Sequence, residues 1–344
     1  MNRKLSRPQR RLSARPARET VAQWMEAWLG DYVAQNVKIS TRVSYENITR
    51  NQIIPHLGHF RLSMLKKTHI NDFYQTLLHS GRADGMGGLS VKTIRNVHIV
   101  LHRAMREAAE REIIGCNPAT GAHIPGFRGG PRKHAEALTL PEQRALTALC
   151  GTDAVGTAIV MALGTGLRMG ELLGLRWGDV DFTARTVSVS RQLSRLKDYT
   201  PGAKAKTRLF LQDGTKTGSS TRVIPIDRAL ARRLRDYKKA QRAANPGCPP
   251  DMIFTGRDGC YLDPAVFRYQ YRRLLLRAGA HSHTIHALRH TFATRALEAG
   301  VPVKVISQIM GHAGSRITMD TYSHVLPVFQ SEAMTRIARY IGAS

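Results

Sequence analysis

The feature that most constrains the fold is a break in hydrophobic patterning over residues 115–137. This segment contains three prolines and five glycines, and neither a helical nor a strand period runs through it. Regular patterning resumes on both sides, and 344 residues are enough for two domains. We therefore expect a linker here, with a boundary near residue 130, between a domain of residues 19–114 and another of residues 138–326.

The first of these domains is predicted to be helical. Apolar residues recur at helical spacing in its first part: Val21, Trp24, Met25, Trp28, Leu29 and Tyr32. Polar caps and one proline mark the later helices. The second is expected to begin at Ser40 or Thr41 and to end at Pro55, the third to begin at Thr68, and a long fourth helix to begin at Ser90.

The second domain mixes helices with strands. Thr139 is expected to cap a helix that has Pro141 in its first turn. Further elements follow from periodicity and alternation: helices at 153–163 and 168–173, strands at 186–190, 208–211 and 222–226, and a later helix that starts at Asp263 and Pro264. Residues 212–221 are expected to join the last two strands.

The charge balance restricts the partners. The chain has 52 Lys and Arg residues against 25 Asp and Glu residues, a formal net charge of +27. Such an excess repels itself unless a polyanion neutralises it, which favours DNA or RNA first and an anionic membrane surface second. No apolar run approaches the roughly 18–20 residues of a membrane span, and no basic amphipathic helix with a broad apolar face is present. The pattern favours nucleic acid and no membrane.

Basic residues concentrate in two kinds of place. Residues 1–18 carry one lysine, six arginines and no acid, so this tail is expected to be disordered when free and to follow a phosphate backbone when bound. On the polar faces of the predicted helices lie the candidate DNA contacts Arg42, Arg50, Lys92, Arg95 and Arg103. The four cysteines form no CxxC pair, so no metal site is expected, and no motif points to a cofactor.

Two clusters contain paired residues that can bind an anion. In GTGLRMGELLGLRWGDVD, Arg168 begins a predicted helix and Glu171 lies one turn on, where a carboxylate can hold a guanidinium rigidly. In HTIHALRHTFATRALEAG, His286 and Arg289 share one helix face. They combine a permanently charged group with one that titrates near neutrality.

A third cluster, IMGHAGSRITMDTYSHV, contains Gly311, which is expected to end a helix, His312 directly after it, and Tyr322 ten residues later. None of the three clusters is specific alone, but their order is: R-x-x-E, a lysine in a strand turn, H-x-x-R-H, G-H and T-Y. This order resembles the tyrosine recombinases of the phage-integrase type over about residues 138–326. The helical N-terminal part resembles the core-binding domain of that family in architecture.

The resemblance implies a mostly α fold with a small antiparallel β-sheet. A four-helix SAM-like core-binding domain precedes an α+β tyrosine-recombinase catalytic domain, and together they form a C-shaped clamp on DNA. Position by position, the resemblance implies these catalytic residues: Arg168, Lys216, His286, Arg289, His312 and the nucleophile Tyr322. Glu171 and His290 match supporting positions. Residues 194–208 exceed what a tight hairpin needs, and Lys204 and Lys206 there are further candidates for DNA contact.

The resemblance also implies a reaction and its partners. Tyr322 attacks a DNA phosphodiester to give a 3′-phosphotyrosine and a free 5′ hydroxyl, and a second DNA end reverses the step without metal or ATP. Two such rounds through a four-way junction give recombination. The implied partners are double-stranded DNA with paired recombination sites, a homotetramer docked through residues 327–344, and an accessory directionality factor. The implied location is the cytoplasm, in association with the nucleoid.

Several alternatives remain open from the sequence. Within the family, the integrase of a phage or mobile element is favoured over a housekeeping recombinase that resolves chromosome dimers, and a small-element invertase has the same active site. A type IB topoisomerase uses a similar residue set. In a different class, residues 295–322 resemble a helix-turn-helix, so a non-catalytic DNA-binding regulator also fits.

Overall fold

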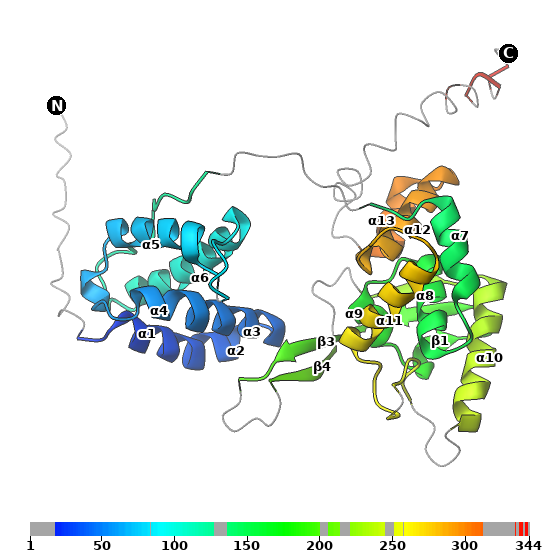
Figure 1. Ribbon diagram of the computed structural model, residues 1–344, viewed down its shortest axis with the longest axis horizontal. Helices are drawn as coiled ribbons and strands as arrows, with labels where there is room; N and C mark the ends of the chain where they lie inside the picture. Colours follow the sequence, from blue (N-terminus) through cyan, green and yellow to red (C-terminus); the bar gives the residue numbers. More distant parts are fainter. Residues whose placement is uncertain are drawn as a thin grey trace, which may run out of the picture. The chain divides into compact units, whose positions relative to one another are not determined.

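The computed structural model describes residues 18–82, 84–126, 136–199, 206–213, 221–244, 251–256, 258–311, 334, 337–339 and 341–342 (Figure 1). These residues fall into two compact units. The first contains residues 18–126 and Tyr199, and the second contains the other described residues from 136 onward. Over these ranges no helix is both long enough and apolar enough to cross a membrane. The fold is mostly α with small antiparallel sheets, as predicted.

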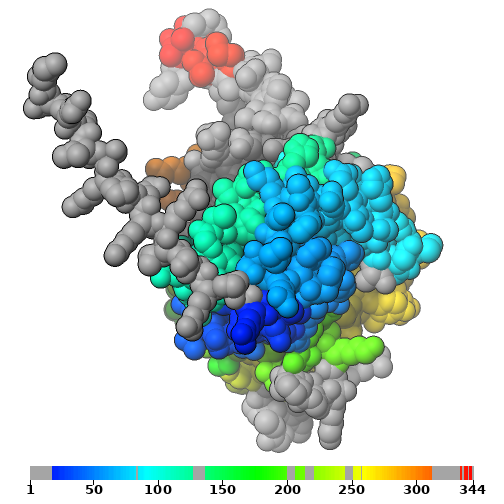
Figure 2. All heavy atoms as spheres, turned by 90° about the vertical axis from the view of Figure 1, so that its left-hand side faces the viewer, coloured from blue at the N-terminus to red at the C-terminus, as the bar shows by residue number. Residues whose placement is uncertain are grey.

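The first unit is entirely helical. Its elements are α1 (Val21–Trp28), a π-helical turn (Leu29–Val33), α2 (Ala34–Asn36), α3 (Ile39–Ile48), a second π-helical turn (Thr49–Ile53), α4 (Ile54–Leu57), a short 3-10 helix (Leu62–Met64), α5 (Lys67–Ser80) and α6 (Val91–Glu110). In Figure 2 the blue, cyan and teal atoms of these helices form one continuous surface. The predicted Ser90 cap is confirmed, since its hydroxyl accepts the Thr93 N–H at 3.2 Å.

The expected bounds of two helices in this unit are wrong. Helix α3 begins at Ile39, so Ser40 and Thr41 lie inside it. The chain also stays helical past Pro55, because the preceding π-helical turn lets Pro55 occupy the first turn of α4, where a missing N–H costs little. Helix α5 starts at Lys67 rather than at Thr68.

Aromatic side chains build the core of the first unit. Trp28 is 1% exposed and stacks on the rings of Tyr32 and Tyr45, with centroids 6.2 and 5.7 Å away. The indole N–H of Trp24 donates to the carbonyl of Ala104 on α6 at 3.1 Å. These contacts hold α1 and α3 against α6, the longest helix of the unit.

The second unit surrounds two small sheets with helices. Its elements are α7 (Leu140–Leu149), α8 (Ala154–Thr165), α9 (Met169–Leu173), a 3-10 helix (Trp177–Asp179), β1 (Val180–Asp181), β2 (Thr186–Val189), β3 (Arg191–Lys197), β4 (Thr207–Asp213), β5 (Arg222–Pro225), α10 (Arg228–Ala244), α11 (Pro264–Arg277), α12 (His286–Glu298) and α13 (Val303–Met310). The predicted helix starts at Thr139 and Asp263 are confirmed by side-chain caps.

The strands form two separate antiparallel sheets. One has the order β1-β2-β5, with Val187 opposite Ile224, and the other is the hairpin β3-β4, with Leu193 opposite Leu211. Strand β3 was not predicted, because in RQLSRLK only Leu193 is buried and the alternation is weak. Strands β4 and β5 follow each other in the chain but belong to different sheets.

Helix α8 is the centre of the second unit. Its sequence AVGTAIVMALGT is apolar on nearly all sides, which is typical of a helix buried all round. It contacts α7, α9, α10, α11 and α12. Asp153 caps its first turn by accepting the N–H groups of Val155 and Gly156 at 2.8 and 3.1 Å. Gly166 ends it in the left-handed conformation, with φ +65°.

This cap gives a first prediction. Asp153→Ala is expected to lower the free energy of unfolding of the second unit by about 1 kcal/mol, because two N–H groups lose their acceptor. Asp153→Asn is expected to retain most of the stability that Asp153 contributes, since an amide oxygen can accept the same hydrogen bonds. Urea denaturation measures both, and an Asn variant as unstable as the Ala variant would contradict the capping role.

Candidate active site

Arg168 and Glu171 form a closed unit at the start of α9. Arg168 is the residue before the first turn, and Glu171 lies one turn on. The Glu171 carboxylate accepts the Arg168 backbone N–H at 3.1 Å and its Nη1 at 2.7 Å. The Glu171 side chain is 3% exposed, whereas that of Arg168 is 39% exposed. The pairing predicted from their spacing is therefore present. The buried Glu171 carboxylate anchors the Arg168 guanidinium, which remains partly exposed to solvent.

Two glycines explain how α9 reaches its position. A Cβ at Gly170 would lie 2.9 Å from the carbonyl oxygen of Leu193, and one at Gly174 would lie 3.0 Å from the Leu193 nitrogen. Any side chain at either position would push α9 away from β3. The glycines of RMGELLG therefore let the helix that carries Glu171 lie directly against the hairpin β3-β4.

Helix α12 supplies the second cluster. Arg289 is 2% exposed and donates from Nη1 to the carbonyl of Gly166 at 2.7 Å and from Nη2 to that of Met310 at 2.8 Å. It thereby joins the end of α8 to the end of α13. The rings of His286 and His290 meet edge to face, with centroids 4.6 Å apart.

The electrostatics of α12 keep its histidines neutral. Partial burial and the charges of Arg289 and Arg168 lower the pKa of His286, although its side chain still reaches solvent. Burial, His286 and Arg289 lower the pKa of His290 to about 4. A neutral imidazole at position 286 can accept a proton near pH 7.

The last turn of α13 brings the clusters together. Gly311 ends this helix in the left-handed conformation, with φ +63°, as predicted. Nη2 of Arg168 donates to the Gly311 carbonyl at 3.1 Å, next to the Met310 carbonyl that Arg289 contacts. Residues from two motifs about 120 positions apart therefore meet at one helix end, directly before His312 in the chain.

Sequence reasoning missed Arg222, the first residue of β5. Its side chain is 8% exposed, and its Nη2 donates to the Glu171 carboxylate at 2.9 Å. Burial alone would raise the pKa of Glu171, but the hydrogen bond from Arg222 and the charges of Arg222 and Arg168 outweigh burial and lower this pKa. The available signal was an arginine at the start of the strand predicted over residues 222–226.

The predicted residues Lys204, Lys216, His312 and Tyr322 lie outside the described residues, as do residues 1–17 and most of 327–344. Lys206 is described and exposed.

In the first unit, the candidate DNA contacts differ in their partners. Arg42 pairs with Glu46 at 3.1 Å, and Arg50 pairs with Glu26 at 3.2 Å. Arg103 donates to the hydroxyls of Tyr32 and Tyr45 at 3.1 and 3.2 Å. Lys92 and Arg95 are exposed on α6.

The arrangement is suited to binding an anion. Arg168, partly exposed, and the buried Arg289 donate to the end of α13, and a neutral imidazole lies on α12, which also carries Arg289. Guanidinium groups match phosphate oxygens in geometry. Among the described residues, no cluster of His, Cys, Asp and Glu could hold a metal ion.

Comparison with known proteins defines the class. Residues 142–327 match the model of the phage integrase family, and residues 20–78 match its N-terminal SAM-like domain. The chain belongs to the phage integrase family, whose members are tyrosine recombinases, that is, site-specific DNA recombinases.

Individual relatives agree with this assignment. A XerC-like tyrosine recombinase of Caldanaerobacter subterraneus is 30% identical, over 92% of this chain and 82% of its own length. The integrase of Mycobacterium phage L5 is 26% identical, over 93% of this chain and 80% of its own length. The Tn1549 transposon integrase in complex with transposon right end DNA is 26% identical and superposes with a TM-score of 0.71, over 93% of this chain and 99% of that one. Lambda integrase, at 16% identity and a TM-score of 0.58 in its tetramer on a Holliday junction, shares the fold.

The histidine pair gives a second prediction, on the pH dependence of stability. His290 is neutral when folded, with a pKa of about 4, against about 6.5 when unfolded. The neutral His290 side chain therefore leaves the free energy of unfolding undiminished above pH 6.5. As the pH falls toward 4, the unfolded chain takes up a proton that the folded one does not, and the free energy of unfolding falls by about 3 kcal/mol in all. His290→Gln removes this proton uptake. The free energy of unfolding of the variant should therefore fall less steeply than that of the wild type as the pH is lowered. Denaturant titrations at pH 7, 5.5 and 4.5 measure the difference, and parallel profiles would refute the assignment.

Proposed function

We propose that this recombinase cleaves DNA with Tyr322 as the nucleophile and with Arg168 and Arg289 as the groups that bind the scissile phosphate. The observation that carries the proposal is the convergence of both arginines on the last turn of α13, directly before His312. Motif order alone specifies residue types along the chain, whereas this convergence supports a single phosphate-binding site.

The arginines meet the electrostatic demand of the reaction. A phosphodiester is already an anion, and its pentavalent transition state places more negative charge on the non-bridging oxygens. Guanidinium groups that are fixed in place stabilise this charge without reorganising during the reaction. The Glu171 carboxylate holds Arg168 in position, and His312 supplies a further hydrogen bond to the phosphate.

Proton transfer completes the proposed chemistry. The Tyr322 hydroxyl has an ordinary pKa near 10 and needs a base or a positive field to attack. His286 is the proposed base, because its lowered pKa leaves it neutral and able to accept this proton. Lys216 is the proposed acid, which protonates the leaving 5′ oxygen. The 3′-phosphotyrosine ester conserves the energy of the broken bond, so a second 5′ hydroxyl can displace the tyrosine.

We place the reaction in the integration and excision of a mobile element. Relatives named as integrases of phages L5 and D29 and of the Tn1549 transposon support this choice, whereas the relatives named XerC support the housekeeping alternative. Strand exchange between paired sites requires four active subunits, so a homotetramer on DNA, docked through residues 327–344, belongs to the same proposal.

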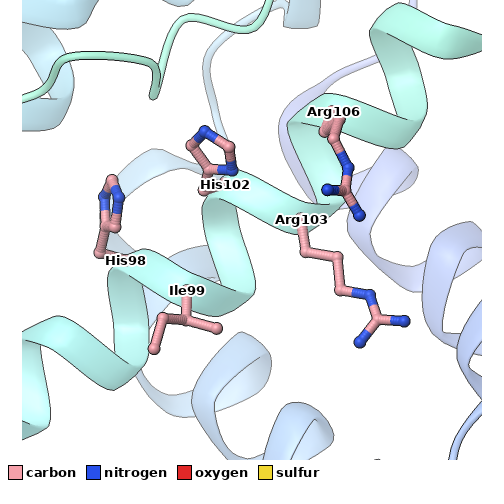
Figure 3. A pocket seen from close by; sticks show the side chains of 5 residues that line it. All are labelled: His98, Ile99, His102, Arg103 and Arg106. Carbon is pink, nitrogen blue, oxygen red and sulfur yellow. The ribbon is translucent and has the colours of Figure 1, made fainter.

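One face of α6 is the proposed DNA contact of the first unit. Three of its exposed positions, Lys92, Arg95 and Arg106, recur at helical spacing on the side opposite the core. Arg103 lies beside them, with His98, Ile99 and His102 around a shallow pocket (Figure 3). Its two tyrosine partners hold the guanidinium in place, which lowers the entropy lost on binding phosphate.

The nucleophile gives a third prediction. Wild-type protein incubated with labelled DNA from the region flanking its own gene is expected to form a slow-migrating, protease-sensitive adduct on denaturing gels. Tyr322→Phe should bind the same fragment and form none, because it lacks the attacking oxygen. Tyr269→Phe, which removes a hydroxyl from an exposed side chain on α11, serves as the matched control and should form the adduct. Specific binding without an adduct from any of the proteins would favour the non-catalytic regulator.

The α6 face gives a fourth prediction. If Arg95 contacts a phosphate, Arg95→Ala should weaken binding to all DNA sequences alike and lower the slope of log K against log salt by about 1. Arg82→Ala is the control within the same unit, since Arg82 is exposed but pairs with Asp84 at 2.6 Å. Binding titrations at several salt concentrations measure both slopes, and equal changes in the two variants would argue against a specific contact at Arg95.

A further inference from the structure

Arg222 is a buried arginine that lies outside the motifs described above. It is the first residue of β5, and its guanidinium lies between the Glu171 carboxylate and the end of α13. Nη2 and Nη1 donate to the two oxygens of Glu171 at 2.9 and 3.4 Å, while Nε donates to the carbonyl of Ile309 at 2.6 Å. One buried side chain thus joins the sheet, α9 and α13.

The contact with Ile309 is one of three hydrogen bonds from arginine side chains to backbone carbonyls at the end of α13. Arg222 donates to the carbonyl of Ile309, Arg289 to that of Met310 and Arg168 to that of Gly311, at 2.6, 2.8 and 3.1 Å. The last carbonyls of a helix have no partner within it and carry the negative end of its dipole. Here each of three consecutive carbonyls receives an arginine from a different element.

Gly311 shows how tightly Arg222 fits beneath this turn. The residue has φ +63°, a conformation that side chains disfavour. A Cβ there would also lie 2.8 Å from Nη1 of Arg222. The close approach of the guanidinium is therefore a second reason for glycine at the position that precedes His312.

We propose that Arg222 is a positioning residue for DNA cleavage, which acts through Glu171 and through the end of α13 without touching DNA. It donates to both oxygens of the Glu171 carboxylate that Arg168 also contacts, and so fixes the direction of the Arg168 guanidinium. Its bond to Ile309 fixes the backbone from which His312 follows. This inference rests on the catalytic roles proposed for Arg168 and His312.

The kinetic test uses Arg222→Ala and Arg222→Lys on a DNA fragment that forms the adduct. At saturating DNA, the single-turnover rate of adduct formation should fall about 100-fold for Ala, because a misplaced phosphate-binding group costs about this much. Lys keeps the charge but lacks the guanidinium fork that reaches both partners, so the Lys variant should form the adduct about tenfold faster than the Ala variant. The Kd for DNA should stay within about twofold, since Arg222 does not touch DNA.

Arg191→Ala is the matched control. Arg191 forms another partly buried ion pair in the same unit, with Asp179 at 2.6 Å. Its loss should destabilise the unit without slowing adduct formation by the folded protein. Equal slowing in the Arg191 and Arg222 variants, or a wild-type rate in Arg222→Ala, would overturn the proposal. If Arg222→Ala does not fold, Arg222→Lys decides on the same criteria.

Two further measurements isolate the route. Combining Arg222→Ala with Glu171→Gln should slow adduct formation clearly less than the product of the two single effects, whereas a fully additive result contradicts action through Glu171. Amide hydrogen exchange in free protein, measured over residues 303–312, should become faster in Arg222→Ala and not in Arg191→Ala. Because this measurement needs no cleavage, it tests the positioning of α13 even if the proposed nucleophile is wrong, and unchanged exchange would refute it.

Discussion

The buried carboxylate of Glu171 is the interaction on which the site depends. A carboxylate that is 3% exposed is costly unless it is paired, and removal of one partner of a buried pair leaves an uncompensated charge. Here Arg168 and Arg222 both donate to it from different elements. The shared carboxylate explains how Arg168 remains 39% exposed and still has a fixed direction, as a phosphate-binding group requires.

The end of α13 is the second constraint, and it follows from the first. Three guanidinium groups in a small volume repel one another, and the single Glu171 carboxylate neutralises only part of their charge. The carbonyls of Ile309, Met310 and Gly311 supply the remaining acceptors at the negative end of a helix dipole. The same contacts hold the backbone that leads to His312, so one set of hydrogen bonds stabilises the arginines and places the next residue in the chain.

Local signals in the sequence predicted much of the fold and the ion pair that begins α9. The caps at Ser90, Thr139 and Asp263, the left-handed end at Gly311 and the pairing of Arg168 with Glu171 depend on residues a few positions apart, and all are present. The failures have longer-range causes. Strand β3 forms because it pairs with β4 and lies against α9, although its own alternation is weak. The helix beyond Ile48 survives Pro55 through a π-helical turn that propensity does not foresee.

The sequence by itself determined the family, through the order of its motifs, and the position of several helix ends, because capping and periodicity act over one or two turns. Only the tertiary structure decided that Arg222 joins Arg168 and Arg289 at the end of α13. It also decided that Arg103 is held by two tyrosines while Arg95 stays exposed on the same helix. A basic residue has the same charge at every position, and its partners depend on which distant elements the packing of the core brings beside it.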